Sequence, residues 1–157
     1  MNCTEREVIE LKEIERILTE AKVCRLALID GDFPYIIPLC FGFDIDSDKL
    51  TLYFHTSEKG RKLDIIKENN NAAFEIDKLI EIVPGDIACR YSARYECITG
   101  QGTLEVINGI EKLTGLNHIM AKYSENTHEH KYSEQMLNNV VLLKLTVESF
   151  CCKAHRE

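Results

Sequence analysis

The chain has 157 residues, of which 45% are hydrophobic, and a formal net charge of −7. These values fit one soluble domain with a proper core, so we expect residues 1–157 to form a single domain. The acidic balance argues against a nucleic-acid-binding surface, and no apolar run approaches membrane-spanning length. The polar, acidic amino terminus does not resemble a signal peptide, and we expect a cytoplasmic protein with no membrane or nucleic-acid partner.

The first predicted element is an amphipathic helix. The run Thr4-Glu-Arg-Glu7 has the form of a capping box, and apolar residues recur at helical spacing from Val8 to Ala21. Two strands are then predicted over 23–29 and 35–44, because Asp30-Gly-Asp32 is a strong hairpin signal. Pro38 cannot donate to a strand ladder, so it indicates an edge, a bulge or a ligand-facing stretch.

The rest of the chain is also rich in strand patterns. Strands are predicted over 50–54 and 72–76, one or two long strands over 91–107, and an apolar strand over 140–147; helices are predicted up to about residue 67 and over 110–121. Gly100 and Gly102 would permit a bend or a close backbone approach. Many strands joined by short turns, with few helices, indicate a mainly β (α+β) fold, read from this pattern as a closed antiparallel barrel with attached helices.

Seven cysteines are spaced irregularly in a chain without an export signal, which favours reduced thiols over a disulfide framework. A zinc site built from Cys151, Cys152 and His155 is not expected, because adjacent cysteines rarely share one tetrahedral ion. His128 and His130 lie in a polar segment and are interpreted as loop histidines. The sequence therefore predicts no metal site.

The strongest functional signal is the segment from Tyr53 to Asp64, where a β-prone run ends in a polar turn and then becomes helical. A helix start presents unpaired N–H groups and a positive dipole end, so a phosphate placed there could be met by backbone donors and side chains. The hydroxyls and cations of this turn are Thr56, Ser57, Lys59, Arg61 and Lys62. The alternative is an ordinary capped helix with a solvated basic first turn.

Three motifs in order carry a family resemblance: Pro34-Tyr-Ile-Ile-Pro-Leu-Cys-Phe-Gly-Phe43, then Tyr53-Phe-His55 with Gly60-Arg-Lys62, then Tyr95-Glu-Cys-Ile-Thr-Gly-Gln-Gly102. Together they resemble the pyridoxamine 5′-phosphate oxidase-like superfamily, and within it the nitroimidazole-resistance (Nim) group. The resemblance runs from the first helix to Lys153. It implies a split β-barrel homodimer that binds FMN at the subunit interface.

The resemblance also implies which residues contact the cofactor. The phosphate would be held by Thr56, Ser57, Lys59, Arg61 and Lys62; the flavin ring would lie beside Ile36, Ile37, Pro38 and Leu39; and Tyr95, Cys97, Ile98 and Lys153 would approach it, the first three from the partner subunit. His55 matches a histidine near the flavin. Two positions depart from the pattern, because Cys97 stands where serine is expected and Cys151-Cys152 where a Thr-Gly pair often precedes the lysine.

Two classes of function stay open from the sequence. The first is an FMN-dependent, nitroreductase-like oxidoreductase in which His55 donates a proton to a small acceptor. The second is a non-catalytic flavin- or haem-binding module, because a fold does not fix a function. His55 could also be a strand-end histidine satisfied by backbone, and Arg90 and Arg94 could reach the pocket mouth or form surface pairs. A vitamin B6 oxidase is disfavoured, since the chain has no tryptophan.

Overall fold

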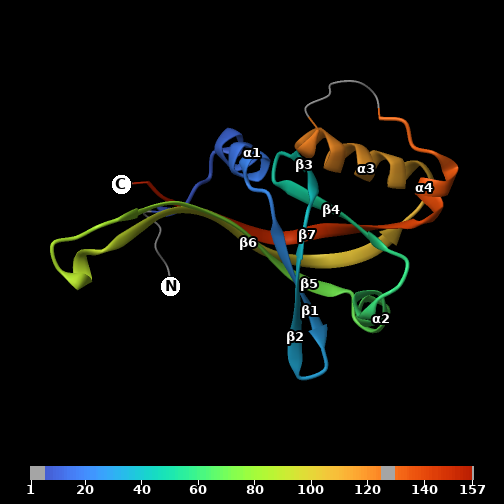
Figure 1. The fold of residues 1–157 in the computed structure, drawn as a ribbon, viewed down its shortest axis with the longest axis horizontal. Helices are drawn as coiled ribbons and strands as arrows, with labels where there is room; N and C mark the ends of the chain where they lie inside the picture. Colours follow the sequence, from blue (N-terminus) through green and yellow to red (C-terminus); the bar gives the residue numbers. More distant parts are fainter. Residues whose placement is uncertain (1–5, 125–129, 157) are drawn as a thin grey trace.

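The computed structural model describes residues 6–124 and 130–156, and its strands form one seven-stranded antiparallel sheet. The strand order is β2-β1-β5-β6-β7-β4-β3 (Figure 1). The strands are β1 Cys24–Asp30, β2 Phe33–Leu39, β3 Gly42–Asp46, β4 Lys49–Ser57, β5 Asn71–Val83, β6 Ser92–Ile107 and β7 Val140–His155. The predicted antiparallel split β-barrel is confirmed, but the closed barrel is corrected, because β2 and β3 form the two edges of the sheet.

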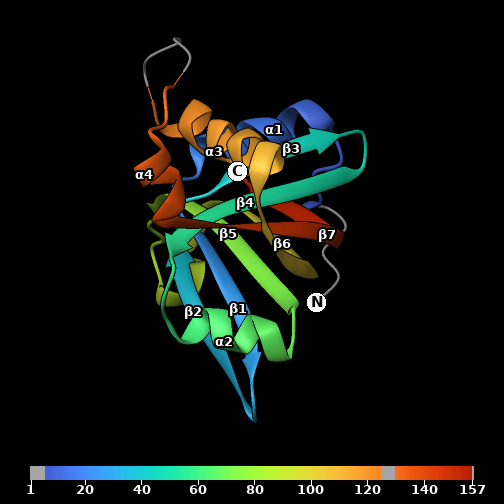
Figure 2. The ribbon, with the colours of Figure 1, turned by 90° about the vertical axis from the view of Figure 1, so that its right-hand side faces the viewer.

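The helices of the described residues are α1 Leu11–Glu20, α2 Arg61–Glu68, α3 Gly109–Tyr123, α4 Glu134–Asn138 and the short 3₁₀ helix η2 Ala88–Arg90. Figures 1 and 2 show α1 and α3 at the end of the sheet that carries β3, and α2 at the opposite end beside the β1–β2 hairpin. Across the described ranges, no helix is long and apolar enough to cross a membrane.

The core lies on one face of the curled sheet. Alternate strand residues point into it and are fully buried, among them Leu26, Phe54, Ile76, Ile98 and Leu145. The residues between them point to the opposite face, which we call the outer face; on β1, β5 and β6 it includes Ala27, Ala73, Cys97 and Gln101. The outer face is therefore the only side of these strands on which a ligand can meet their side chains.

The end helices are held by specific contacts. The ammonium group of Lys122, near the end of α3, lies 4.2 Å from the ring centroid of Phe41 and donates hydrogen bonds to the carbonyls of Leu18, Thr19 and Ala21 at the end of α1. A cation at this end of a helix stabilises it, because the last carbonyls carry the negative end of the dipole. Lys122 thus ties α1 to α3.

Several predicted boundaries are wrong. The amino-terminal helix begins at Leu11, because the backbone N–H of Val8 bonds the carbonyl of Cys152 and holds this stretch against β7; Thr4 lies outside the described residues. The strand predicted over 35–44 is divided into β2 and β3, and the strand predicted over 50–54 runs from Lys49 to Ser57. The Asp30-Gly-Asp32 hairpin, the edge position of Pro38 and the helix that ends near Lys67 are confirmed.

Two strands are much longer than predicted. β5 continues past Ile76 to Val83, and β6 is one strand that pairs with it along its length. The outer part of this hairpin, residues 79–95, projects from the body of the molecule at the left of Figure 1, and we call it the arm. β7 likewise continues to His155 and pairs with β6, which brings the end of the described chain to the base of the arm.

Candidate functional site

The turn between β4 and α2 is the first part of the candidate site. The N-cap residue Gly60 has a φ of 143°, a conformation that favours glycine, and α2 begins at Arg61. No side chain caps the start of α2, since the Ser57 hydroxyl donates instead to the carbonyl of Lys59 at 2.9 Å. Of the alternative, an ordinary capped helix with a solvated basic first turn, the side-chain cap is therefore wrong. An uncapped helix start with adjacent cations can receive an anion.

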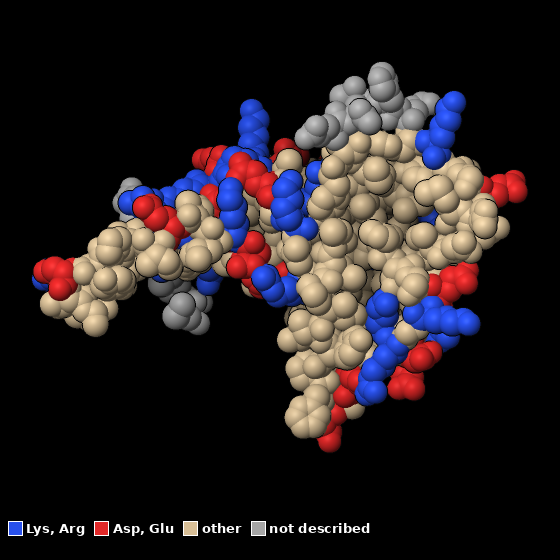
Figure 3. All heavy atoms as spheres, in the orientation of Figure 1, with Lys and Arg blue, Asp and Glu red and all other residues tan. Residues whose placement is uncertain are grey.

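The side chains of this segment do not all face the same way. Lys59 and Arg61 are exposed and Lys62 is half-buried, whereas Thr56 is 8% exposed and lies on the buried side of β4. Figure 3 shows basic atoms over α2 with acidic atoms beside them. The exposed cations and the free helix start are thus available to a phosphate group, whereas the Ser57 hydroxyl already donates its hydrogen to the carbonyl of Lys59. The Thr56 hydroxyl faces the core, so a phosphate at the surface does not meet it directly.

Asp30 is a neighbour of this turn that the sequence analysis missed. Its Oδ2 accepts a hydrogen bond from Arg61 Nε at 2.7 Å and lies 2.6 Å from Arg61 Nη2. This pair fastens α2 to the end of β1 in the β1–β2 hairpin. No sequence signal could identify the pair, because the two residues are 31 positions apart.

His55 lies within β4, opposite Leu142 of β7, and its side chain is exposed. It does not end the strand, as the sequence predicts, because β4 continues to Ser57. Among the described residues its imidazole has no hydrogen-bond partner, so the alternative of a histidine satisfied by backbone is not supported. An exposed imidazole without a fixed partner is free to exchange a proton with a ligand.

The predicted ring-binding residues lie on β2, the edge strand next to this turn. Ile36 is 61% exposed, whereas Ile37 and Leu39 pack against the core. One backbone edge of β2 pairs with β1, and the other borders the open side of the sheet. A strand with an open edge can offer backbone donors and acceptors to a planar ligand, and Pro38 removes one donor from that edge.

The second group of predicted residues lies on β6 and β7. Cys97 is directly opposite Lys153, and Tyr95 is opposite His155, with ring centroids 6.1 Å apart. Cys97 is half-buried on the outer face, and burial raises the pKa of its thiol, which stays protonated at neutral pH. Ile98 is fully buried and points into the core. Only the backbone of Ile98 is therefore available to a ligand on the outer face.

The two groups are not brought together within one chain. β1 and β5 separate β2 from β6 in the sheet. Neighbouring strands lie about 4.8 Å apart, so Cys97 is about 14 Å from β2 along the sheet, and Lys153 is farther still. Arg90 and Arg94 are also removed from the turn, and each forms an ion pair on the arm, with Asp86 and Glu81 respectively. The surface-pair interpretation of these two arginines is confirmed.

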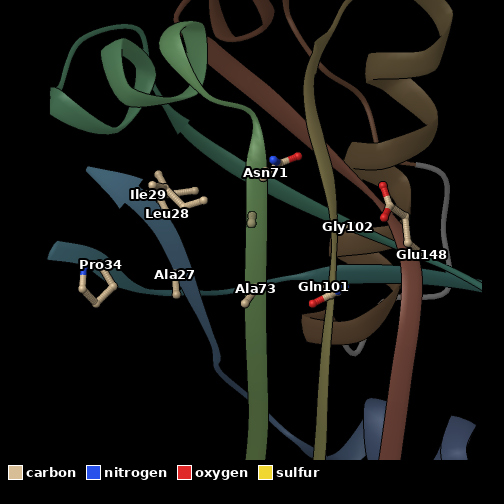
Figure 4. A pocket seen from close by; sticks show the side chains of 10 residues that line it. Ala27, Leu28, Ile29, Pro34, Asn71, Ala73, Gln101, Gly102 and Glu148 are labelled. Carbon is tan, nitrogen blue, oxygen red and sulfur yellow. The ribbon is translucent and has the colours of Figure 1, made fainter. Parts of the chain in front are cut away.

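A hollow of about 390 Å³ lies on the outer face between these groups (Figure 4). It is lined by Ala27, Leu28, Ile29, Pro34, Asn71, Ala72, Ala73, Gln101, Gly102 and Glu148. Ala27 pairs with Ala73, so two small side chains stand at outward positions of the adjacent strands β1 and β5 and leave space above them. None of the predicted cofactor contacts lines it. The sequence carries no local signal for it, because Ala27 and Ala73 become neighbours only through the pairing of β1 with β5.

Comparisons with known proteins agree with this arrangement. A sequence model of the family described as pyridoxamine 5′-phosphate oxidase matches residues 10–153. A candidate 5-nitroimidazole antibiotic resistance protein from Bacteroides thetaiotaomicron is 29% identical, with a TM-score of 0.79 over 94% of this chain and 86% of that one. A search of curated protein sequences gave no match.

Two more distant solved structures share the fold. An FAD- and haem-binding protein from Mycobacterium smegmatis has a TM-score of 0.82 at 20% identity, over 97% of this chain and 74% of that one. A flavocytochrome from Azotobacter vinelandii has a TM-score of 0.79 at 15% identity, over 100% and 73%. At these identities the likeness concerns the fold alone.

Proposed function

Because the chain belongs to the pyridoxamine 5′-phosphate oxidase family, we propose that it is a flavoprotein that binds FMN and passes electrons to a small acceptor such as a nitroaromatic compound. The observation that carries this proposal is the uncapped, basic start of α2 beside the open edge of β2. The turn fits a phosphate group, and the edge strand fits a planar ring. An acidic protein with one small basic cluster fits a single anionic ligand better than a polyanion.

In this proposal, Lys59, Arg61, Lys62 and the N–H groups at the start of α2 hold the phosphate. The charge-assisted hydrogen bonds that they donate are stronger than neutral ones. Arg61 shares its guanidinium with Asp30, which holds the side chain at the end of β1. The Ile36–Leu39 backbone borders the ring. The protein thus supplies binding and orientation, and FMN, when bound, supplies the electron-transfer chemistry.

The proposed site is completed by a second copy of the chain. Tyr95, Cys97 and Lys153 lie too far from the phosphate turn to reach the same ligand within one protomer, because Ser57 pairs with Val140 at the start of β7 whereas Lys153 and its partner Cys97 lie near the other end of that strand. A two-fold homodimer places these residues of each copy over the turn of the other and forms two equivalent sites. Lys153 of the partner subunit would provide a cation near the ring, where it favours a negatively charged reduced ligand.

His55 is proposed as the group that delivers a proton to the acceptor. Its imidazole is exposed and has no competing hydrogen bond among the described residues, and it lies two residues before Ser57 at the start of the phosphate turn. A histidine can both hold and release a proton near neutral pH. The neighbouring turn holds the phosphate independently, so this role is separable from cofactor retention.

A non-catalytic flavin- or haem-binding protein is the second candidate, favoured by the fold shared with an FAD- and haem-binding protein and a flavocytochrome. The visible spectrum of the purified protein, followed by anaerobic stopped-flow mixing with NADH or NADPH, separates the two. The proposal predicts flavin absorbance that bleaches with the donor and recovers when a nitroaromatic acceptor is added. Bound flavin that neither donor reduces supports the non-catalytic protein, and a Soret band supports haem.

A further inference from the structure

Glu96 of β6 is the only Asp, Glu, Lys or Arg side chain that is buried in the described part of the chain, and it is 2% exposed. Its Oε1 accepts a hydrogen bond from Arg156 Nε at 2.9 Å and a second one from the guanidinium of Arg16 on α1. Its Oε2 is buried without a hydrogen-bond partner among the described residues. Replacing a buried ion pair by apolar side chains often leaves a protein equally or more stable, so stability alone does not account for this carboxylate.

Glu96 lies between two of the proposed flavin contacts. Its neighbours on β6, Tyr95 and Cys97, point to the outer face, whereas the Glu96 side chain points to the core side. Across the sheet, Cys97 is opposite Lys153 of β7, and Glu96 is opposite Ala154. Because Glu96 does not face a ligand on the outer face, its effect on such a ligand must pass through the geometry of the strands.

Apolar side chains specify the strand register only weakly in this part of the sheet. The two positions that continue the core side of β6 beyond Ile98 are Glu96 and Arg94, and neither is apolar. Register irregularities also flank the segment, at residues 79–81 between β5 and β6 and at residues 101–102 between β6 and β7. A slip of one residue turns the side chains of the slipped strand to the opposite face. A specific contact is therefore needed to fix the register.

The end of β7 also needs an anchor. β4 pairs with β7 only over residues 140–146, so the last residues of β7, at the base of the arm in Figure 1, have only β6 as a neighbouring strand. On their other side, the segment before α1 makes a backbone bridge to Lys153. Arg156 directly follows the strand and bonds Glu96 of β6 at 2.9 Å and Glu13 of α1 at 2.7 Å. Chain ends fray unless they are tied down, and this cluster ties β7 to both β6 and α1.

We propose that Glu96 is a positioning residue that fixes the register of β6 and β7 at the proposed flavin contacts. Resting on the proposed function, it keeps the Lys153 ammonium on the outer face, over the flavin bound by the partner subunit. Arg16 and Arg156 hold the carboxylate from α1 and from the end of β7, so three elements meet at one side chain. Glu96 thus acts through Lys153 and does not touch the ligand.

The preference of the protein for reduced over oxidised FMN tests this role, because a residue that only stabilised the fold would not change it. Lys153→Ala removes the proposed cation and should lower the ratio of the two affinities by about 10-fold, the loss expected for one charge-assisted hydrogen bond. Glu96→Gln keeps the shape of the side chain and removes its charge, and it should lower the ratio at least about 3-fold. Equilibration with a reference dye measures the ratio as a reduction potential, and 10-fold corresponds to about 30 mV for a two-electron couple.

A double-variant cycle separates positioning from a direct effect. If Glu96 acts through Lys153, Glu96→Gln should cause no further fall in the ratio once Lys153→Ala is present. Glu105→Gln is the matched control, because Glu105 is also on β6 and pairs with a cation of β7, Lys144 at 3.0 Å, but at the other end of the strand. An unchanged ratio in Glu96→Gln, a further fall in the Lys153→Ala background, or an equal fall in Glu105→Gln would overturn the proposal.

Hydrogen exchange of the flavin-free protein tests the same role without a ligand. In Glu96→Gln, peptides that cover residues 95–101 and 150–156 should exchange at least about 10-fold faster, whereas residues 140–146 of β7 should not change, because the opening is confined to the segment that lost its anchor. Arg156→Gln, at an exposed position, should show the same pattern if Glu96→Gln does not fold. Unchanged exchange in both peptides would overturn the proposal. Unmodified protein that binds no FMN would instead refute the proposed function, and the exchange result would still decide whether Glu96 fixes the register.

Discussion

Asp30 at the end of β1 holds the guanidinium group of Arg61 in the first turn of α2, with 2.7 Å between Oδ2 and Nε. The pair therefore places a carboxylate beside the cations of the proposed phosphate site. Exposed ion pairs contribute at most about 1 kcal/mol, so a phosphate dianion can compete for this guanidinium. The Asp30 carboxylate therefore orients Arg61 and also competes with the phosphate for its guanidinium.

We expect Asp30→Asn to tighten FMN binding. The amide keeps an acceptor for Arg61 but removes the negative charge, and a gain of about 0.5–1 kcal/mol corresponds to about 2–5-fold in Kd. Fluorescence titration measures it. Asp32→Asn is the control, because it removes the same charge from the same hairpin turn. An equal gain in both variants, or a gain that persists with Arg61→Ala, would show that the Asp30–Arg61 pair is not involved.

The double variant Arg61→Ala/Lys62→Ala should bind FMN at least about 100-fold more weakly. Each charge-assisted hydrogen bond contributes about 1.5–3 kcal/mol, with allowance for non-additivity. Lys67→Ala is the matched control, since it removes a cation from the last turn of the same helix. Calorimetric titration with FMN measures the affinity of all three proteins. Unchanged affinity in the double variant would contradict a phosphate site at this turn.

His55→Ala should retain near-stoichiometric FMN but slow transfer to the acceptor by about 10²–10⁴-fold, the range for loss of a general acid. His55→Gln keeps a hydrogen-bonding side chain of similar size and should show the same loss if proton delivery is the role. Stopped-flow reoxidation of the reduced protein gives the rate. Normal turnover would make His55 a structural residue, and loss of FMN would make it a binding residue.

The network at α1 predicts a loss of stability in acid. Hydrogen bonds from Arg156 and Arg16 lower the pKa of Glu13, and those from Lys78 and Arg16 lower the pKa of Glu20. The folded protein then binds fewer protons than the unfolded chain, so this stabilisation is present above pH 4.5 and is lost as the pH falls through the folded pKa values. The urea concentration at the midpoint of unfolding should decrease as the pH is lowered below about 4.5.

The contribution of these two groups can be isolated by substitution. Glu13→Gln/Glu20→Gln should have a shallower acid dependence than the unmodified protein, because the neutral amides cannot titrate. Glu15→Gln is the control on the same helix. If all three proteins lose stability in parallel as the pH falls, the acid sensitivity arises elsewhere in the molecule.

The sequence predicted the local elements of this fold better than their extent. The Asp30-Gly-Asp32 turn and the edge position of Pro38 followed from backbone chemistry that a few residues determine. The helix predicted from Val8 begins only at Leu11, because Val8 pairs with Cys152, a contact made 144 positions away. The β5 side of the arm was missed because residues 79–83 lack the apolar and polar alternation that marks a half-buried strand, whereas its β6 side falls in the strand predicted over 91–107.

Some features of the candidate site could likewise be predicted from the local sequence, and others could not. The turn at Lys59–Lys62 was located from local chemistry, and the structure places it at an uncapped helix start. The partner of Arg61, the burial of Ile98 and the hollow floored by Ala27 and Ala73 depend on strand order and register, which no local pattern encodes. Which residues share a site was therefore open until the topology was known.

The central claim is that this protein binds FMN through its phosphate at the β4–α2 turn. Calorimetric titration of flavin-free protein with FMN and with riboflavin tests it directly, because the two ligands differ only in the phosphate. The account predicts one FMN per chain and riboflavin binding at least about 100-fold weaker, as expected when two or more charge-assisted hydrogen bonds are lost. Equal affinity for the two flavins, or binding of neither, would contradict it.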